Sequence, residues 1–147
     1  MTPLHRACAR GCVACVEALL AHPRTRVSAQ DTHGQTALHW AVYCGYHACV
    51  AALVAHTRAC AALQDTQGHT PLHAAAVWGR QRTHCMTALI PHSSICTDME
   101  DSRGHTPRSI ISALEFDGKE EILALLREKQ DALEMGDSTA PCKKDEL

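Results

Sequence analysis

The apolar residues of this chain fall into paired segments that polar segments separate. The longer segment of the first pair has apolar residues at helical spacing, at Val16, Leu19 and Leu20, and this spacing marks one buried helix face. Similar stretches begin at Cys49 and Cys85. The pattern therefore predicts at least three similar helix pairs joined by polar loops.

A four-residue motif opens each pair and sets the period. Thr2-Pro3-Leu4-His5 recurs as Thr36-Ala37-Leu38-His39 and as Thr70-Pro71-Leu72-His73, and a degenerate fourth copy is Thr106-Pro107-Arg108-Ser109. The spacings between copies are 34, 34 and 36 residues. Self-similarity at such a period is the signature of a stacked-repeat protein.

The residue types in each copy have a local structural reason. Thr caps a helix because its hydroxyl accepts from an orphan backbone N–H, and Pro fits the first helical position. A Gly nine positions after the Thr permits the left-handed turn that ends a short helix, and an Asp-x-x-Gly segment has turn chemistry. These residues are Gly11, Gly45, Gly79, Asp31, Asp65 and Asp101.

This pattern resembles the ankyrin repeat over about residues 2–130, on the Thr-Pro-Leu-His motifs, the Gly and the Asp-x-x-Gly loops. The resemblance implies an all-α ankyrin-repeat solenoid of stacked helix-turn-helix units joined by β-hairpin-like loops. Neighbouring units would share one core, since a single unit cannot bury its apolar face alone. The expected divisions are repeats at 1–35, 36–69 and 70–105, a degenerate C-capping repeat at 106–130 and a disordered tail at 131–147.

Three units depart from the regular pattern. The third has two extra residues between Gly79 and His84, and the fourth has Arg108 and Ser109 in place of Leu-His and a first helix region lengthened to Gly118. Charged residues later in the fourth unit fit a polar cap on the stack. The first unit lacks a preceding loop, so we expect further repeats, a partner or fraying at that end.

Composition and charge narrow the function classes. Hydrophobic residues make up 46% of the chain and aromatic residues 3%, so small aliphatic side chains and Cys must fill the core. A formal net charge of −2 argues against nucleic acid as a partner, because phosphate binding requires a basic face. No apolar run of about 18 residues predicts a membrane span. We expect no cofactor, catalytic residue or small-molecule substrate, since the phosphate-binding, dinucleotide-binding and hydrolase motifs are absent.

Nine Cys and eleven His raise the alternative of a metal or redox protein. The odd Cys count argues against a disulfide framework, so we expect reduced thiols, as in the cytoplasm or nucleus. We expect Cys15, Cys49 and Cys85 to be small buried hydrophobes, because stacked helices lie about 8–10 Å apart, too far for a bridge. The Cys12-x-x-Cys15 segment lacks the βαβ context of thioredoxin-like chemistry, although a helix N-terminus favours thiolate at Cys12.

The motif residues His5, His39 and His73 invite a zinc hypothesis. The same repeat distance keeps three equivalent rings from reaching one ion. The resemblance implies instead that each His forms local hydrogen bonds and orients the loop of a neighbouring repeat.

The resemblance also implies a non-catalytic scaffold or adaptor, or an interaction module of a larger multidomain protein, that binds a so far unidentified protein on a concave face. Tyr43 and Trp78 are the expected aromatic anchors, unless Trp78 packs against its own loop; Trp40 is expected in the core. Histidines at the loop tips predict pH-dependent binding. The predicted partner-binding residues are His33, Gln35, Tyr43, Cys44, Gln67, His69, Val77, Trp78, Arg103 and His105.

The last four residues, Lys144-Asp145-Glu146-Leu147, match the retrieval signal of the endoplasmic reticulum. The segment from Met1 to His22 lacks the layout of a signal peptide. We therefore expect a cytoplasmic or nuclear protein, with the lumen of the endoplasmic reticulum as the alternative.

Overall fold

The computed structural model describes residues 1–57, 59–92 and 97–134. Within these residues eight α-helices form four pairs and no strand occurs, as predicted for a solenoid of helix pairs. The inner helices are α1 (Pro3–Arg10), α3 (Ala37–Cys44), α5 (Pro71–Trp78) and α7 (Pro107–Ala113). The outer helices are α2 (Val13–Ala21), α4 (His47–His56), α6 (Thr83–Leu89) and α8 (Lys119–Glu134). Short 3-10 helices occur at η1 (Ala59–Ala62), η2 (Gly79–Arg82) and η3 (Ile90–His92).

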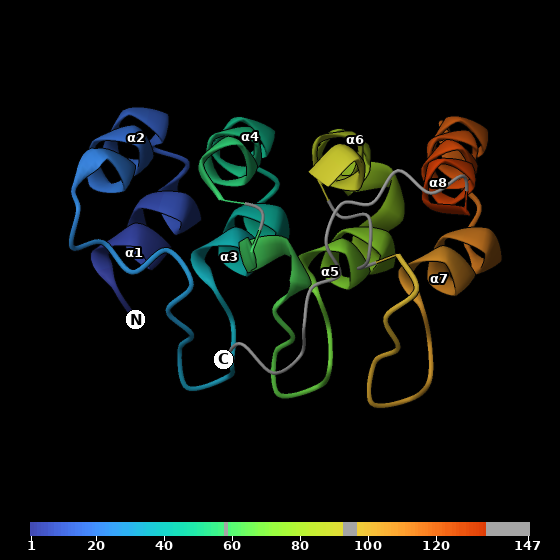
Figure 1. Ribbon diagram of the computed structural model, residues 1–147, viewed down its shortest axis with the longest axis horizontal. Coiled ribbons are helices and arrows are strands. Elements are labelled where there is room, and N and C mark those ends of the chain that lie inside the picture. Colours follow the sequence, from blue (N-terminus) through green and yellow to red (C-terminus); the bar gives the residue numbers. More distant parts are fainter. Residues whose placement is uncertain (58, 93–96, 135–147) are drawn as a thin grey trace.

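The helices lie in two rows (Figure 1). The inner helices form one row and the outer helices the other, and the three long loops project beyond the inner row. Consecutive inner helices contact each other along the stack, and so do consecutive outer helices. This arrangement leaves the loops and the ends of the inner helices free of a second layer.

Every inner helix begins with the same cap. The Thr hydroxyl accepts from the backbone N–H three residues later, and the side chain of that later residue accepts from the Thr backbone N–H. Two orphan donors are satisfied at once, which fixes where each helix starts. The four pairs are Thr2 with His5, Thr36 with His39, Thr70 with His73, and Thr106 with Ser109.

The ends of the inner helices differ between units. Gly11 and Gly45 take the predicted left-handed conformation, with φ of 71° and 80°. Gly79 has φ 40° and ψ −107°, because the two extra residues continue from it as η2. In the fourth unit α7 stops at Ala113, since Leu114 is extended. The lengthened region up to Gly118 is thus a connection and not a longer helix.

One continuous core runs through the stack. The motif residues Leu4, Leu38 and Leu72 are buried, and the outer helices supply residues such as Val50 and Ile122. Burial of a Leu side chain contributes roughly 1.5–3 kcal/mol, so repeating it in each unit supports the stack. The prediction of a shared core made of small side chains is confirmed.

Helix α8 continues to Glu134, four residues beyond the predicted end of the capping repeat at residue 130. Ala132 and its neighbours are good helix formers, so the helix extends into the segment predicted as tail. Residues 135–147, with the retrieval-like tetrapeptide, lie outside the described residues. In the described part of the chain, no helix combines the length and apolarity that crossing a bilayer requires.

Candidate partner-binding surface

The motif histidines connect each inner helix to the loop that leads into the next inner helix. The backbone N–H of Thr36 donates to Nδ1 of His39 at 3.1 Å, so Nε2 carries the ring proton and donates to the His69 carbonyl at 2.9 Å. The same bonds join His73 to the His105 carbonyl at 2.9 Å and His5 to the Gln35 carbonyl at 3.0 Å. The predicted role of these histidines is confirmed.

Two of these buried rings, those of His39 and His73, have a lowered pKa. Burial lowers the pKa of His39, and the hydrogen bond to the His69 carbonyl only partly offsets it. Burial likewise lowers the pKa of His73, and the hydrogen bond to the His105 carbonyl partly offsets this shift. Among the described residues, no three His, Cys, Asp or Glu side chains are grouped so that they could hold a metal ion.

Hydrogen bonds within and between loops hold the loop tips in place. Asp65 accepts from the backbone N–H groups of Gln67 at 2.9 Å and His69 at 3.0 Å, and Asp31 and Asp101 do the same in their own loops. Successive loops are joined by bonds from the Thr66 N–H to the His33 carbonyl and from the Ser102 N–H to the Gln67 carbonyl, both 3.0 Å. The three tips therefore form one ordered edge.

We call the exposed side chains on this edge the loop-tip cluster; its members are His33, Gln67, Arg103 and His105. Two other predicted binding residues in the loops are less exposed and make contacts within the structure. His69 is 21% exposed and places Nε2 3.4 Å from a carboxylate oxygen of Asp101. Gln35 is partly buried, and its carbonyl accepts from His5.

Apolar exposure is concentrated at the other end of the inner helices. Val77 is 52% exposed and Trp78 49% exposed, and Cys44 is exposed at the matching end of α3. We call these three residues the helix-end cluster. The exposure of Trp78 argues against its being packed into its own loop.

Tyr43 lies between the two clusters. Its ring is partly buried and packs against the core. Burial raises the pKa of the Tyr43 phenol, the charge of Asp65 adds to this effect, and a hydrogen bond with the Gln35 side chain opposes it. The phenol therefore points back toward the loops, in keeping with the tilt of helical side chains toward the N-terminus.

Seven of the ten predicted binding residues thus fall into two separate clusters. The loop-tip cluster precedes the inner helices and the helix-end cluster terminates them. An inner helix of eight residues is about 12 Å long. A partner that touches both clusters must therefore cover at least one inner helix along its length.

Sequence reasoning did not identify Arg82, which the two-residue insertion in the third unit brings into this surface. Its Nη2 donates to the Tyr43 carbonyl at 2.6 Å, and its guanidinium lies 5.9 Å from the centre of the Trp78 ring, within cation–π range. The guanidinium lies directly over Gly45, where an added Cβ would come 2.7 Å from Nη1. The irregular spacing after Gly79 was the only available signal.

Trp40, predicted in the core, is only partly inside it. It packs against the core cluster, and its indole N–H donates to a carboxylate oxygen of Asp31 at 3.0 Å. A buried indole needs such a partner, and the bond joins α3 to its own loop.

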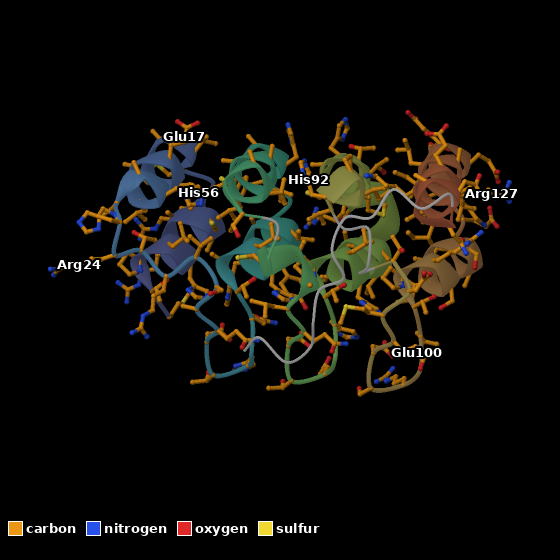
Figure 2. All side chains as sticks on the ribbon, viewed as in Figure 1. Glu17, Arg24, His56, His92, Glu100 and Arg127 are labelled. Carbon is orange, nitrogen blue, oxygen red and sulfur yellow. A yellow bond between two sulfur atoms is a disulfide. The ribbon has the colours of Figure 1, made fainter. Side chains whose placement is uncertain are left out.

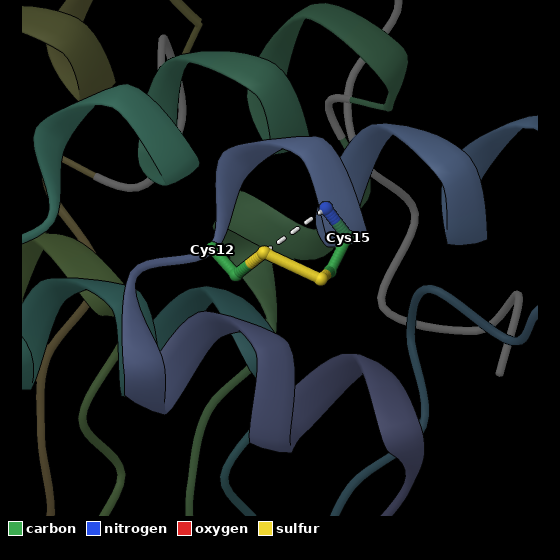
Figure 3. Close-up of a disulfide and its surroundings, with 2 residues drawn as sticks. All are labelled: Cys12 and Cys15. Carbon is green, nitrogen blue, oxygen red and sulfur yellow. Dashed lines mark hydrogen bonds between the residues drawn. A yellow bond between two sulfur atoms is a disulfide. The ribbon is translucent and has the colours of Figure 1, made fainter.

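The predicted reduced state of the thiols is wrong for one pair. Cys12 and Cys15 form a disulfide at the start of α2 (Figure 3). Cys15 is exposed, unlike Cys49 and Cys85, which are buried as predicted. Cys49 lies near Cys8 of the preceding unit.

Comparison with protein families agrees with this architecture. Residues 1–62 match the family model described as ankyrin repeats (3 copies), and residues 67–102 match that of a single ankyrin repeat. A search of curated proteins found no match. The two matched segments cover about two thirds of the chain and contain the first three capped inner helices. The chain belongs to the ankyrin-repeat family.

Proposed function

We propose that this chain is a non-catalytic recognition module that binds a partner protein across the inner helices, with the helix-end cluster as the anchor. The supporting observation is the pair Val77 and Trp78, about half exposed side by side at the end of α5. Exposed apolar groups rimmed by polar ones mark interaction sites, and Trp is enriched among the residues that contribute most to binding.

The loop-tip cluster supplies the polar part of the proposed contact. The interloop bonds hold its backbone in place before binding, which reduces the entropy cost of association. Arg103 contributes a positive charge, and the exposed rings of His33 and His105 gain one when protonated. The partner segment we expect therefore carries an apolar side chain for Trp78 and acidic groups for the loops.

The test compares capture of cellular proteins by the wild-type chain and by Trp78→Ala, alone and with Tyr43→Ala. Glu17→Ala with Arg127→Ala is the matched control, because both side chains point outward from the outer helices (Figure 2). We expect the Trp78 variants to lose bound protein while the control keeps it, with all variants equally helical by circular dichroism. Equal capture by folded Trp78→Ala would refute the proposal.

The same surface would serve equally well as the interaction module of a longer multidomain protein. We propose a cytoplasmic or nuclear location, where partner proteins are directly accessible. The C-terminal Lys-Asp-Glu-Leu keeps the lumen of the endoplasmic reticulum as the alternative. Protease treatment of intact microsomes decides between them, because a luminal chain is protected and a cytoplasmic one is digested.

A further inference from the structure

We propose that Cys12 and Cys15 are a reversible dithiol–disulfide site on the first repeat, which exchanges with small thiols of the glutathione class. The two residues are joined in the structure and lie at the start of α2 (Figure 3). This site is separate from the proposed binding surface, which is centred on the second and third units.

The pair is accessible to solvent, whereas most of the other cysteines that the structure describes are buried. Cys15 is exposed and Cys12 partly exposed. Four free cysteines are buried: Cys8, Cys49, Cys60 and Cys85. Burial raises the pKa of Cys8 to about 12, with the nearby Cys49 and Cys44 adding to the shift, and burial raises the pKa of Cys60 to about 11. Thiols of this kind are protonated and unreactive near neutral pH, so these buried cysteines should take little part in exchange.

The position of Cys12 favours its release as a thiolate. It is the N-cap of α2, a nine-residue helix, and its Sγ accepts from the backbone N–H of Cys15 at 3.4 Å. The first turn of α2 contains no acidic residue. A sulfur anion at this place interacts favourably with the positive end of the helix dipole.

The exchange runs in two steps. A small-molecule thiolate attacks the exposed Sγ of Cys15, the Cys12–Cys15 bond breaks, and Cys12 leaves as a thiolate while Cys15 carries the mixed disulfide. A second small thiolate attacks the small-molecule sulfur of that mixed disulfide, which releases Cys15 as a thiolate and one small-molecule disulfide. Two electrons pass from two small thiols to the protein, and solvent protons re-equilibrate with the thiolates. The reverse sequence reoxidises the pair.

The experiment equilibrates the full chain in mixtures of reduced and oxidised glutathione, then labels free thiols in denaturant with N-ethylmaleimide and locates the labels by mass spectrometry. We expect Cys12 and Cys15 to gain and lose their labels together as the ratio changes. The buried cysteines should stay labelled throughout. Exposed Cys44 is the control, because it is a free thiol outside the pair and should carry a mixed disulfide with glutathione. A pair that is fully bridged or fully free at every ratio would overturn the proposal.

Single substitutions test the unequal roles of the two sulfurs. In Cys15→Ser the remaining Cys12 is still the N-cap of α2. In Cys12→Ser the remaining Cys15 lies in the first turn and is not the N-cap. We expect Cys12 to react with iodoacetamide at neutral pH about tenfold faster than Cys15. Circular dichroism verifies that both variants fold. Equal rates in two folded variants would remove the assignment of Cys12 as the favoured leaving group.

Discussion

The third and fourth units begin with the same two residues and then differ. Leu72 is buried completely, whereas Arg108 in its place is partly exposed and bonds to Gln130. His73 bonds to the His105 carbonyl in the loop before α7, whereas Ser109 accepts from the backbone N–H of Thr106. Within the described residues, the inner helix of the third unit contacts those of the second and fourth units, and that of the fourth contacts that of the third. The motif therefore has two parts: Thr-Pro starts the helix in both units, and Leu-His adds core burial and a bond to the loop before the next inner helix, which Arg108 and Ser109 do not supply.

The largest difference in unfolding free energy between the two units should appear at the core position that Leu72 occupies in the third unit and Arg108 in the fourth. Leu72→Ala should lower the free energy of unfolding by about 2–5 kcal/mol, as large-to-small core substitutions do. Arg108→Ala should lower it by less than about 1 kcal/mol, since a partly exposed polar contact contributes little. Urea unfolding followed by circular dichroism measures both. Similar losses at the two positions would show that the fourth unit shares the core as the third does.

The next motif position, His73 in the third unit and Ser109 in the fourth, should give a smaller difference in unfolding free energy. The third unit should again lose more. His73→Ala removes the partner of the Thr70 N–H and of the His105 carbonyl, and an unsatisfied buried group costs about 1–3 kcal/mol. Ser109→Ala loses only an exposed part of a capping box, which is worth about 1 kcal/mol or less. The same unfolding curves apply. A cost at Ser109 equal to that at His73 would contradict the division of the motif.

The buried histidines should also make stability depend on pH. Burial lowers the pKa of His73, a shift that the bond to the His105 carbonyl and the charges of Asp101 and Asp65 partly offset and that His69 reinforces. Below about pH 6.5 the unfolded chain takes up protons that the folded ring resists. Stability is therefore complete above this pH and falls as the pH drops below it.

Thermal melts between pH 7.5 and 5 would detect this slope. The fourth unit contributes nothing to it through Ser109, so Ser109→Ala is the control and should keep the wild-type slope. His73→Gln should show a flatter dependence. An unchanged slope in His73→Gln would assign the pH effect to other groups.

The sequence predicted the features that every unit shares. It missed the exposure of Cys15 in the first unit and the position of Arg82 in the insertion of the third unit. Thr70 and His73 have roles that follow from local chemistry and the motif, so both could be predicted. Cys15 is exposed although Cys49 and Cys85 at matching positions are buried, and periodicity predicts the same burial for all three. Arg82 lies in an insertion, where the repeat pattern gives no position for a side chain.

The smallest difference in stability between the two units should appear at Trp78 and the matching Leu114, and Trp78 also separates surface from core within one helix. Half of this side chain is already exposed, so Trp78→Ala should cost about 1–2 kcal/mol, by area lost from contact, against the larger loss at Leu72. In the fourth unit the corresponding Leu114 is partly buried and turns toward Gly79 of the third unit. Leu114→Ala should therefore cost as much as Trp78→Ala or more, although Leu is smaller. A loss of about 3 kcal/mol or more for Trp78→Ala would place the ring in the core. The third unit would then lack the exposed apolar surface by which it differs from the fourth.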